Sequence, residues 1–237
     1  MVTVAVLYPG HSAEDEFSTL QSRIRNAAFP VIHTWEGPTE HDVDALLEIG
    51  SQQRLTPAAR AAAQLHPDAV MWACTSGSFV YGWYGSSDQA HWVEEAAGVS
   101  SSSTSLAFVA AAHHLGVQSV AVAATYPHDV TAEFVRYLED AGLTITAASA
   151  QDVPSGEDAG ALGPDWVLNL ARTAELGDAE CLLLPDTALH TIEALPDLEA
   201  AVGMPVLTAN QVTAWYGLIL AGHPAVADGL GALFQSG

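Results

Sequence analysis

The clearest candidate for chemistry is the segment 74–78, which follows an apolar run at residues 69–73 and precedes an expected helix. At a strand-to-helix junction a thiol meets backbone N–H groups and the positive end of a helix dipole, and both favour the reactive thiolate. The hydroxyls of Thr75 and Ser76 add hydrogen-bond donors beside it. We therefore predict that Cys74 is a reactive thiolate, with a packed and inert cysteine as the alternative.

The elements that would position this thiol follow from an alternation of short apolar runs with longer amphipathic segments. The runs predicted to be buried strands are residues 2–7, 69–73, 119–124, 181–184 and 205–207. The segments predicted to be helices are residues 14–26, 56–65, 104–115, 130–141 and 164–176. Strands separated by helices indicate βαβ units, so we predict an α/β protein with parallel sheets. The polar run 100–103 is expected to be a strand-to-helix turn.

The two halves of the sequence repeat the same features in the same order. Tyr8-Pro9 and Glu16-Phe17 near the start are echoed by Tyr126-Pro127 and Glu133-Phe134, at offsets of 118 and 117 residues. Such a repeat indicates an internal duplication.

The same repeat aligns residues 74–76 with residues 186–188, because each segment closes an apolar run. We predict two pseudo-symmetric lobes, each a parallel sheet flanked by helices, that face each other across a cleft at the carboxyl ends of their strands. The predicted boundaries are residues 1–97 together with 205–237 for the first lobe, and residues 98–204 for the second.

The repeat places Asp186, and not the second cysteine, opposite Cys74. Cys181 begins its apolar run, and five residues at ~3.3 Å each put it about 16 Å from the cleft. Cys181 is therefore expected to be packed and inert. We expect Asp186 to be a carboxyl group kept protonated by a desolvated cleft, since burial raises a carboxyl pKa. The alternative is that Asp186 caps the following helix.

Two tyrosines are further candidates. Tyr126 follows a predicted strand and should point into the cleft. Tyr8, its counterpart in the repeat, precedes Pro9 and a turn through Ser12 that can present backbone N–H groups. Each tyrosine could instead be a core residue with a satisfied hydroxyl. Because no arginine lies near these motifs, an anion would be held by neutral N–H and O–H donors.

Composition excludes several classes of function. The chain of 237 residues has 28 acidic side chains, six arginines and no lysine, for a formal charge of −22. Such a charge repels nucleic acid and anionic membranes. The lack of lysine excludes a Walker A loop and a Schiff-base lysine. Ten histidines without an HExxH motif predict no metal site.

The two cysteines, and the absence of a signal peptide or of an apolar run near ~18 residues, favour a reduced cytoplasmic compartment.

Taken in order, these motifs resemble the aspartate/glutamate racemase superfamily, and most closely its maleate cis–trans isomerase and arylmalonate decarboxylase branch. The resemblance covers nearly the whole chain, and segment 73–78 is its most specific part. The motifs that carry it are Tyr8-Pro9, residues 73–78, Thr125-Tyr126-Pro127, residues 183–199, and residues 203–211 followed by Ala214-Trp215.

The resemblance implies two pseudo-symmetric lobes that need neither a metal nor an organic cofactor. It also implies two cysteines on opposite faces of a small carboxylate, which Thr, Ser, Tyr and backbone amides hold. Here the second cysteine position is Asp186, and Ser12 stands where maleate isomerases carry an asparagine. The residues predicted to bind substrate are Thr75, Ser76, Tyr126, Thr187, Tyr8, Pro9 and Ser12.

The predicted function is a maleate isomerase-like reaction on a small carboxylate or dicarboxylate, with Cys74 as nucleophile and Asp186 as the proton donor. The alternatives are a racemase or epimerase, an arylmalonate-type decarboxylase, and a non-catalytic carboxylate-binding protein. The expected partner is the small carboxylate alone, and self-association into a homo-oligomer is left open.

Overall fold

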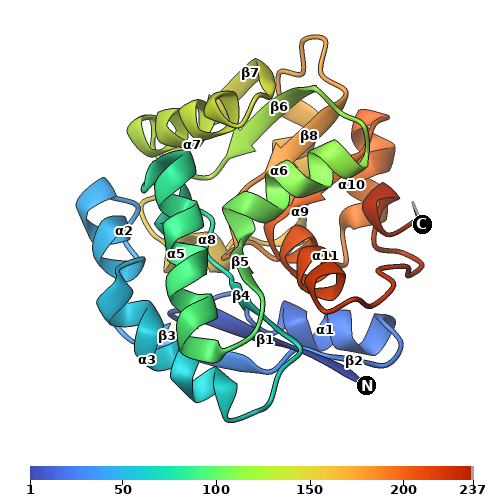
Figure 1. Cartoon of the computed structure of the whole chain (residues 1–237). Helices are drawn as coiled ribbons and strands as arrows, with labels where there is room; N and C mark the ends of the chain where they lie inside the picture. Colours follow the sequence, from blue (N-terminus) through green and yellow to red (C-terminus); the bar gives the residue numbers. More distant parts are fainter. Residues whose placement is uncertain (236–237) are drawn as a thin grey trace.

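The computed structural model describes residues 1–235 and contains two parallel sheets flanked by helices (Figure 1). The first sheet has the order β2-β1-β4-β5, with β3 also paired to β1, and the second has the order β7-β6-β8-β9. The strands of the first sheet are β1 (Val2–Pro9), β2 (Ala27–Ala28), β3 (Val31–Trp35), β4 (Ala69–Trp72) and β5 (Ser101–Ser103). Those of the second are β6 (Ser119–Ala124), β7 (Thr144–Ala150), β8 (Cys181–Leu184) and β9 (Val206–Thr208). The predicted α/β class with parallel sheets is confirmed.

Helices cover both faces of each sheet. They are α1 (Glu16–Arg23), α2 (Val43–Ile49), α3 (Gln52–Ala63), α4 (Ser76–Phe79), α5 (Gly82–Ala97), α6 (Thr104–His114), α7 (His128–Asp140), α8 (Gly156–Gly160), α9 (Pro164–Thr173), α10 (Leu195–Val202) and α11 (Ala209–Leu220), with a 3₁₀ turn at Ala232–Phe234. In Figure 1, α2, α3 and α5 lie on one side of the first sheet and α1 and α11 on the other.

The core has three parts, because successive side chains along each strand point to opposite faces of the sheet. One face of β1 (Val4, Val6) and one face of β6 (Val120, Val122) join a large central core shared by the two sheets. The opposite face of β1 packs against α3 in a second cluster, and the opposite face of β6 packs against α9 and α10 in a third. A strand with both faces buried reads as a continuous apolar run, which is why these runs predicted strands correctly.

Elements without such a pattern were missed. β3 is half-buried at every position, and α11 is buried on nearly all of its faces, so it lacks an apolar stripe. The run 100–103, expected to be a turn, contains β5, which pairs with β4 and leads directly into α6.

The predicted lobe boundaries stay a prediction. Strand pairing crosses them at two places, because β5 pairs with β4 in the first sheet and β9 pairs with β8 in the second.

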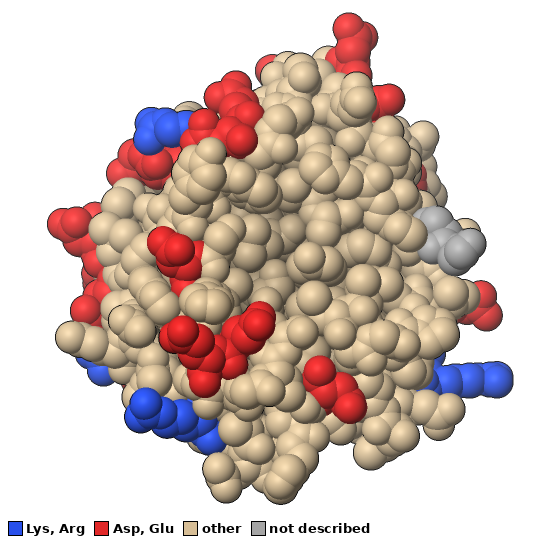
Figure 2. All heavy atoms as spheres, viewed as in Figure 1, with Lys and Arg blue, Asp and Glu red and all other residues tan. Residues whose placement is uncertain are grey.

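Acidic side chains lie in several separate groups over the face shown in Figure 2, and basic side chains lie near its rim. No helix among residues 1–235 is both long enough and apolar enough to span a bilayer.

Candidate active site

The carboxyl ends of four strands converge on one site. β1 ends at Pro9 and β4 runs into Cys74, while β6 is followed by Tyr126 and β8 by Asp186. Parallel strands place these ends at the same edge of their sheet, as expected for ligand sites in α/β folds.

A narrow cavity of about 30 Å³ lies at this place. Its walls combine residues that the sequence predicted with residues that it did not. The lining residues are Tyr8, Pro9, Ser12, Thr39, His41, Leu46, Ile49, Cys74, Ser76, Gly156, Asp186, Thr187 and Ala188. The structure therefore brings together all predicted site residues except Thr75 and Tyr126, which are buried but do not line the cavity.

Cys74 is a buried thiol on the apolar side of this cavity. Its Sγ accepts a hydrogen bond from Gly77 N at 3.3 Å and lies 3.9 Å from Ser76 Oγ. Burial nevertheless raises the pKa of the Cys74 thiol to about 12, and the charge of Asp186 acts in the same direction. Burial therefore works against the expected thiolate. The helix that follows, α4, has only four residues, so its dipole cannot offset the loss of water.

Asp186 lies in a polar cradle. Its Oδ1 accepts a hydrogen bond from Ala188 N at 2.9 Å, and its Oδ2 accepts one from the Thr125 hydroxyl. The next helix, α10, begins at Leu195 and has Ala194 as its N-cap, so Asp186 does not cap a helix. Its bond to the N–H two residues further along is that of an Asx turn.

His41 is a site residue that the sequence analysis missed. It lies in the loop between β3 and α2, where its Nδ1 donates to Val153 O at 2.8 Å and its Nε2 lies 4.0 Å from Asp186 Oδ2. Its ring meets that of Tyr126 edge to face at 4.8 Å between centroids. No motif surrounds this isolated histidine, so only the fold shows its place.

The Tyr8 and Tyr126 hydroxyls donate hydrogen bonds to the backbone carbonyls on either side of Asp186. The Tyr8 hydroxyl donates to Thr187 O at 2.9 Å, and the Tyr126 hydroxyl donates to Pro185 O at 2.9 Å. Burial raises the pKa of both phenols above the usual range. Because both hydroxyl protons are already donated to the backbone, either tyrosine would have to exchange partners to bind a carboxylate.

The remaining predicted residues divide between the wall and the layer behind it. Ser76 and Thr187 line the cavity, as do Pro9 and Ser12. Ser12 Oγ lies 2.8 Å from the Tyr8 hydroxyl. Thr75 is fully buried and is not among the lining residues. Ser12 and Thr187 therefore line the cavity directly, whereas the role predicted for Thr75 stays a prediction.

A second residue that the analysis missed, Glu16, joins the two halves of the site. Its Oε1 accepts hydrogen bonds from Thr191 N at 2.5 Å and Ile192 N at 2.6 Å, and its Oε2 accepts one from Asn210 Nδ2 at 2.8 Å. Burial raises the pKa of Glu16 to about 7. The same Asn210 amide also donates to Thr187 O, so Glu16 is linked to the segment that carries Asp186.

Comparison with known proteins identifies the family. The family model of arylmalonate decarboxylase matches residues 48–234, which is well over half of the chain. The chain therefore belongs to the arylmalonate decarboxylase family. It is 29% identical over 146 residues to arylmalonate decarboxylase from Bordetella bronchiseptica, which covers 60% of this chain and 61% of that enzyme. It is 27% identical over 181 residues to maleate isomerase from Nocardia farcinica, which covers 71% of this chain and 70% of that enzyme.

Solved structures of both enzymes share the whole fold. The maleate isomerase Iso from Pseudomonas putida S16, in a cysteine variant with maleate, superposes with a TM-score of 0.91 at 17% identity and covers 99% of this chain and 98% of its own. A double mutant of arylmalonate decarboxylase in its liganded form gives 0.88 at 23% identity and covers 100% of both chains. A maleate cis–trans isomerase variant from Nocardia farcinica, with a covalently bound succinylcysteine intermediate, gives 0.90 at 23% identity and covers 100% of this chain and 99% of its own. The resemblance stated from the sequence is confirmed, and so is the two-lobed fold.

Proposed function

We propose that the chain is a cofactor-independent isomerase of a small unsaturated carboxylate or dicarboxylate, with Cys74 as nucleophile and Asp186 as proton carrier. One observation carries this proposal. Cys74 and Asp186 leave corresponding strands of the two sheets and line the same buried cavity. Two groups in such positions can act on one substrate carbon–carbon double bond.

The proposed reaction balances without an added reagent. The Cys74 thiol transfers its proton to Asp186, and the thiolate sulfur then forms a bond to one carbon of the double bond. The π electron pair moves to the neighbouring carbon and its carboxylate, and Asp186 delivers the proton to that carbon. Rotation about the new single bond and reversal of these steps release the trans isomer with both side chains restored.

The surroundings of the two groups support this order of events. Burial raises the pKa of Cys74 to about 12, so the thiol needs a nearby proton acceptor to become a nucleophile. Both oxygens of Asp186 accept hydrogen bonds, from Thr125 and from Ala188 N, and these bonds hold its carboxyl group in place. The Nε2 atom of His41 stands 4.0 Å from this carboxylate and can stabilise it as its charge changes.

The walls favour a small anion held by neutral donors. No arginine among residues 1–235 lines the cavity, whereas the hydroxyls of Ser12, Ser76 and Thr187 belong to residues that do. A volume of about 30 Å³ has room for roughly two water molecules, so even maleate requires the site to widen and an aryl group requires more. Because a maleate isomerase is among the relatives, maleate is the first substrate to test.

The test is incubation with maleate, followed by proton NMR for the appearance of fumarate. We expect conversion by the wild-type chain and by Cys181→Ala, because the Cys181 side chain lies in the central core, away from the cavity. No conversion should occur with Cys74→Ser. Turnover of maleate by Cys74→Ser, or its loss in Cys181→Ala alone, would contradict the proposal.

A second candidate is decarboxylation of a substituted malonate, with a racemase or epimerase as a related possibility. The family match favours it, and Leu46 and Ile49 offer an apolar wall on which a substituent could pack. Release of CO₂ from phenylmalonate would identify a decarboxylase, and exchange of the α-proton in deuterated water would identify a racemase. Ligand-induced stabilisation without any of these reactions would indicate a carboxylate-binding protein.

The proposed compartment is the cytoplasm, because a catalytic thiol is kept reduced there.

A further inference from the structure

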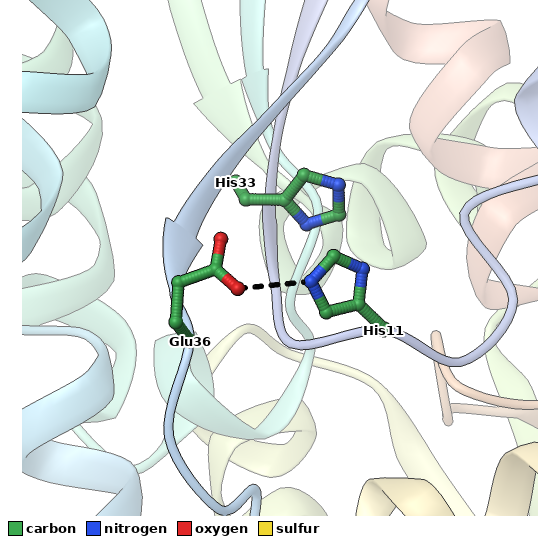
Figure 3. A group of neighbouring side chains, drawn as sticks. All are labelled: His11, His33 and Glu36. Atoms are coloured by element: carbon green, nitrogen blue, oxygen red, sulfur yellow. Dashed lines mark hydrogen bonds and ion pairs between the residues drawn. The ribbon is translucent and has the colours of Figure 1, made fainter.

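Three side chains beside the cavity form a group that the mechanism does not use. His11 lies in the loop after β1, His33 lies on β3, and Glu36 directly follows β3. β1 and β3 pair in parallel with Tyr8 opposite His33, so the ends of the two strands bring these three residues together. Figure 3 shows the two imidazole rings one above the other and the Glu36 carboxylate reaching towards His11.

We propose that His11, His33 and Glu36 form a binding site for a divalent transition-metal cation such as Zn²⁺. One ring nitrogen of each histidine and one carboxylate oxygen of Glu36 lie within 4.8 Å of one another. His11 Nε2 and Glu36 Oε2 are 3.0 Å apart. Ligands at ~2.0–2.1 Å from a tetrahedral zinc ion lie about 3.3 Å from one another, so these three side chains need to move by only about an ångström each.

The surroundings of His11 favour a cation between it and Glu36. Its Nδ1 lies 3.2 Å from Glu14 Oε1, and its Nε2 faces Glu36, so carboxylates stand on both sides of one imidazole. A neutral imidazole has a single N–H and can donate to only one of them. A metal ion at Nε2 satisfies the second carboxylate, while Glu14 holds Nδ1–H and orients the ring, the arrangement common around metal-bound histidines.

The second histidine is held by the backbone. In Figure 3, His33 Nδ1 is the ring nitrogen on the side of His11 and Glu36, and it lies 2.8 Å from Gly10 O, so a metal ion at this nitrogen would take the place of that hydrogen bond. The His11 and His33 rings are 4.1 Å apart between centroids, with 35° between their planes.

The donor set selects the class of metal. Two imidazoles and a carboxylate suit Zn²⁺, Ni²⁺ or Co²⁺, whereas Mg²⁺ and Ca²⁺ prefer oxygen ligands alone. The positive charge of Arg54 would oppose a cation only if it paired with Glu36. Arg54 instead pairs with Glu48 at 2.7 Å and lies 4.4 Å above the Trp35 ring.

The site would lie beside the cavity and outside it. Gly10 and His11 lie between Pro9, the last residue of β1, and Ser12, and both Pro9 and Ser12 line the cavity. A bound cation would therefore tie the loop after β1 to β3 without touching the proposed reacting groups. The inference is independent of the proposed reaction, because cation binding can be measured without turnover.

The test is titration of the whole chain with Zn²⁺ by calorimetry, with the thermal unfolding temperature as a second readout. We expect one saturable site, and His33→Ala and Glu36→Gln should each weaken binding by at least ~10-fold, the smallest loss usual for a metal site whose supporting groups are changed. Zinc should raise the unfolding temperature of the wild type and much less that of the variants. Glu36 is exposed, so its substitution tests binding without loss of the fold.

The matched control is His91→Gln, because His91 and Glu95 form an exposed histidine–carboxylate pair at 3.3 Å without a second histidine. This variant should bind zinc like the wild type, and excess Mg²⁺ should not compete. Absence of a saturable site, equal affinity in all variants, or loss only in His91→Gln would each overturn the proposal.

Discussion

The segments after β4 and β8 hold corresponding places in the two sheets, yet Cys74 in the first segment and Asp186 in the second have different surroundings. Cys74 belongs to an apolar cluster with Ile49, Leu55 and Trp72. Asp186, equally buried, is met by the Thr125 hydroxyl and a backbone N–H. The repeated topology therefore positions two groups around one cavity, and their immediate neighbours differ: apolar side chains surround the thiol, and hydrogen-bond donors meet the carboxyl group.

The hydrogen bonds that hold the segments after β4 and β8 in place also differ. Both tyrosines of the repeat, one from each sheet, donate to carbonyls that flank Asp186. On the other side, Ser105 Oγ donates to Thr75 O at 2.8 Å. The segment around Asp186 is thus held from both sheets, which suits a group that must receive and return a proton at a fixed place.

The largest effect is expected when the thiol is removed. Cys74→Ser should lower turnover by at least ~10³-fold while the fold is kept, because an alcohol is a far weaker nucleophile than a thiol. Cys181→Ala should cost ~1–2 kcal/mol of stability and leave turnover intact. Steady-state kinetics and urea unfolding of both variants provide the measurement. Equal losses of turnover in the two variants would show that the position of Cys74 at the cavity does not determine activity.

The next largest effect concerns the opposite group. Asp186→Asn keeps the size of the side chain and removes its capacity to carry a proton, so kcat should fall by ~10²–10⁴-fold, the usual contribution of a general acid or base. Asp178→Asn, an exposed substitution just before β8, is the matched control. An active Asp186→Asn enzyme with an unchanged pH profile would leave Cys74 to work with water as its proton source.

Glu16 and Glu133, which correspond in the repeat, should differ in their effect on stability. Glu16 is buried and has its pKa raised from 4.5 to about 7, whereas Glu133 pairs with Arg136 at 2.8 Å in a partly exposed ion pair. The folded state holds the Glu16 proton more tightly than the unfolded chain does. The stability that this proton contributes is therefore complete below pH 4.5 and is lost as the pH rises through about 7.

Relative to Glu16→Gln, the wild-type free energy of unfolding should thus fall by up to ~3 kcal/mol over this range. Glu133→Gln should retain the wild-type dependence. Urea unfolding at the two ends of the range measures the difference, and the same pH dependence in Glu16→Gln and wild type would show that Glu16 titrates normally.

A smaller effect is expected from the tyrosines. Tyr126→Phe removes the side-chain donor to Pro185 O, at a cost of ~1–3 kcal/mol, and Tyr8→Phe should cost less because Asn210 still donates to Thr187 O. If the hydroxyls brace Asp186, kcat should fall while KM changes little, and Tyr84→Phe, 84% exposed, should be neutral. A rise in KM alone for Tyr126→Phe would instead make Tyr126 a direct ligand of the carboxylate, as the sequence predicted.

The sequence was sufficient for those parts of the molecule that depend on local pattern. Continuous apolar runs located β1, β4, β6, β8 and β9, and the repeat aligned Asp186 with Cys74. The protonation state of Cys74 was not accessible, because it depends on how completely the fold removes water. His41 and the pair of Glu16 with Asn210 were also missed, since their partners are distant in the chain and no local motif marks them.

The most direct test of the account is mass spectrometry of the intact chain after incubation with maleate. Addition of the Cys74 thiol across the double bond should leave a covalent adduct in the wild-type chain when turnover is stopped by acid, and Asp186→Asn should form much less of it because Asp186 accepts the thiol proton in the first step. We predict an added mass equal to that of maleic acid, located by peptide mapping to Cys74 and absent from Cys74→Ser. An adduct on Cys181, or turnover of maleate that persists in Cys74→Ser, would contradict the account.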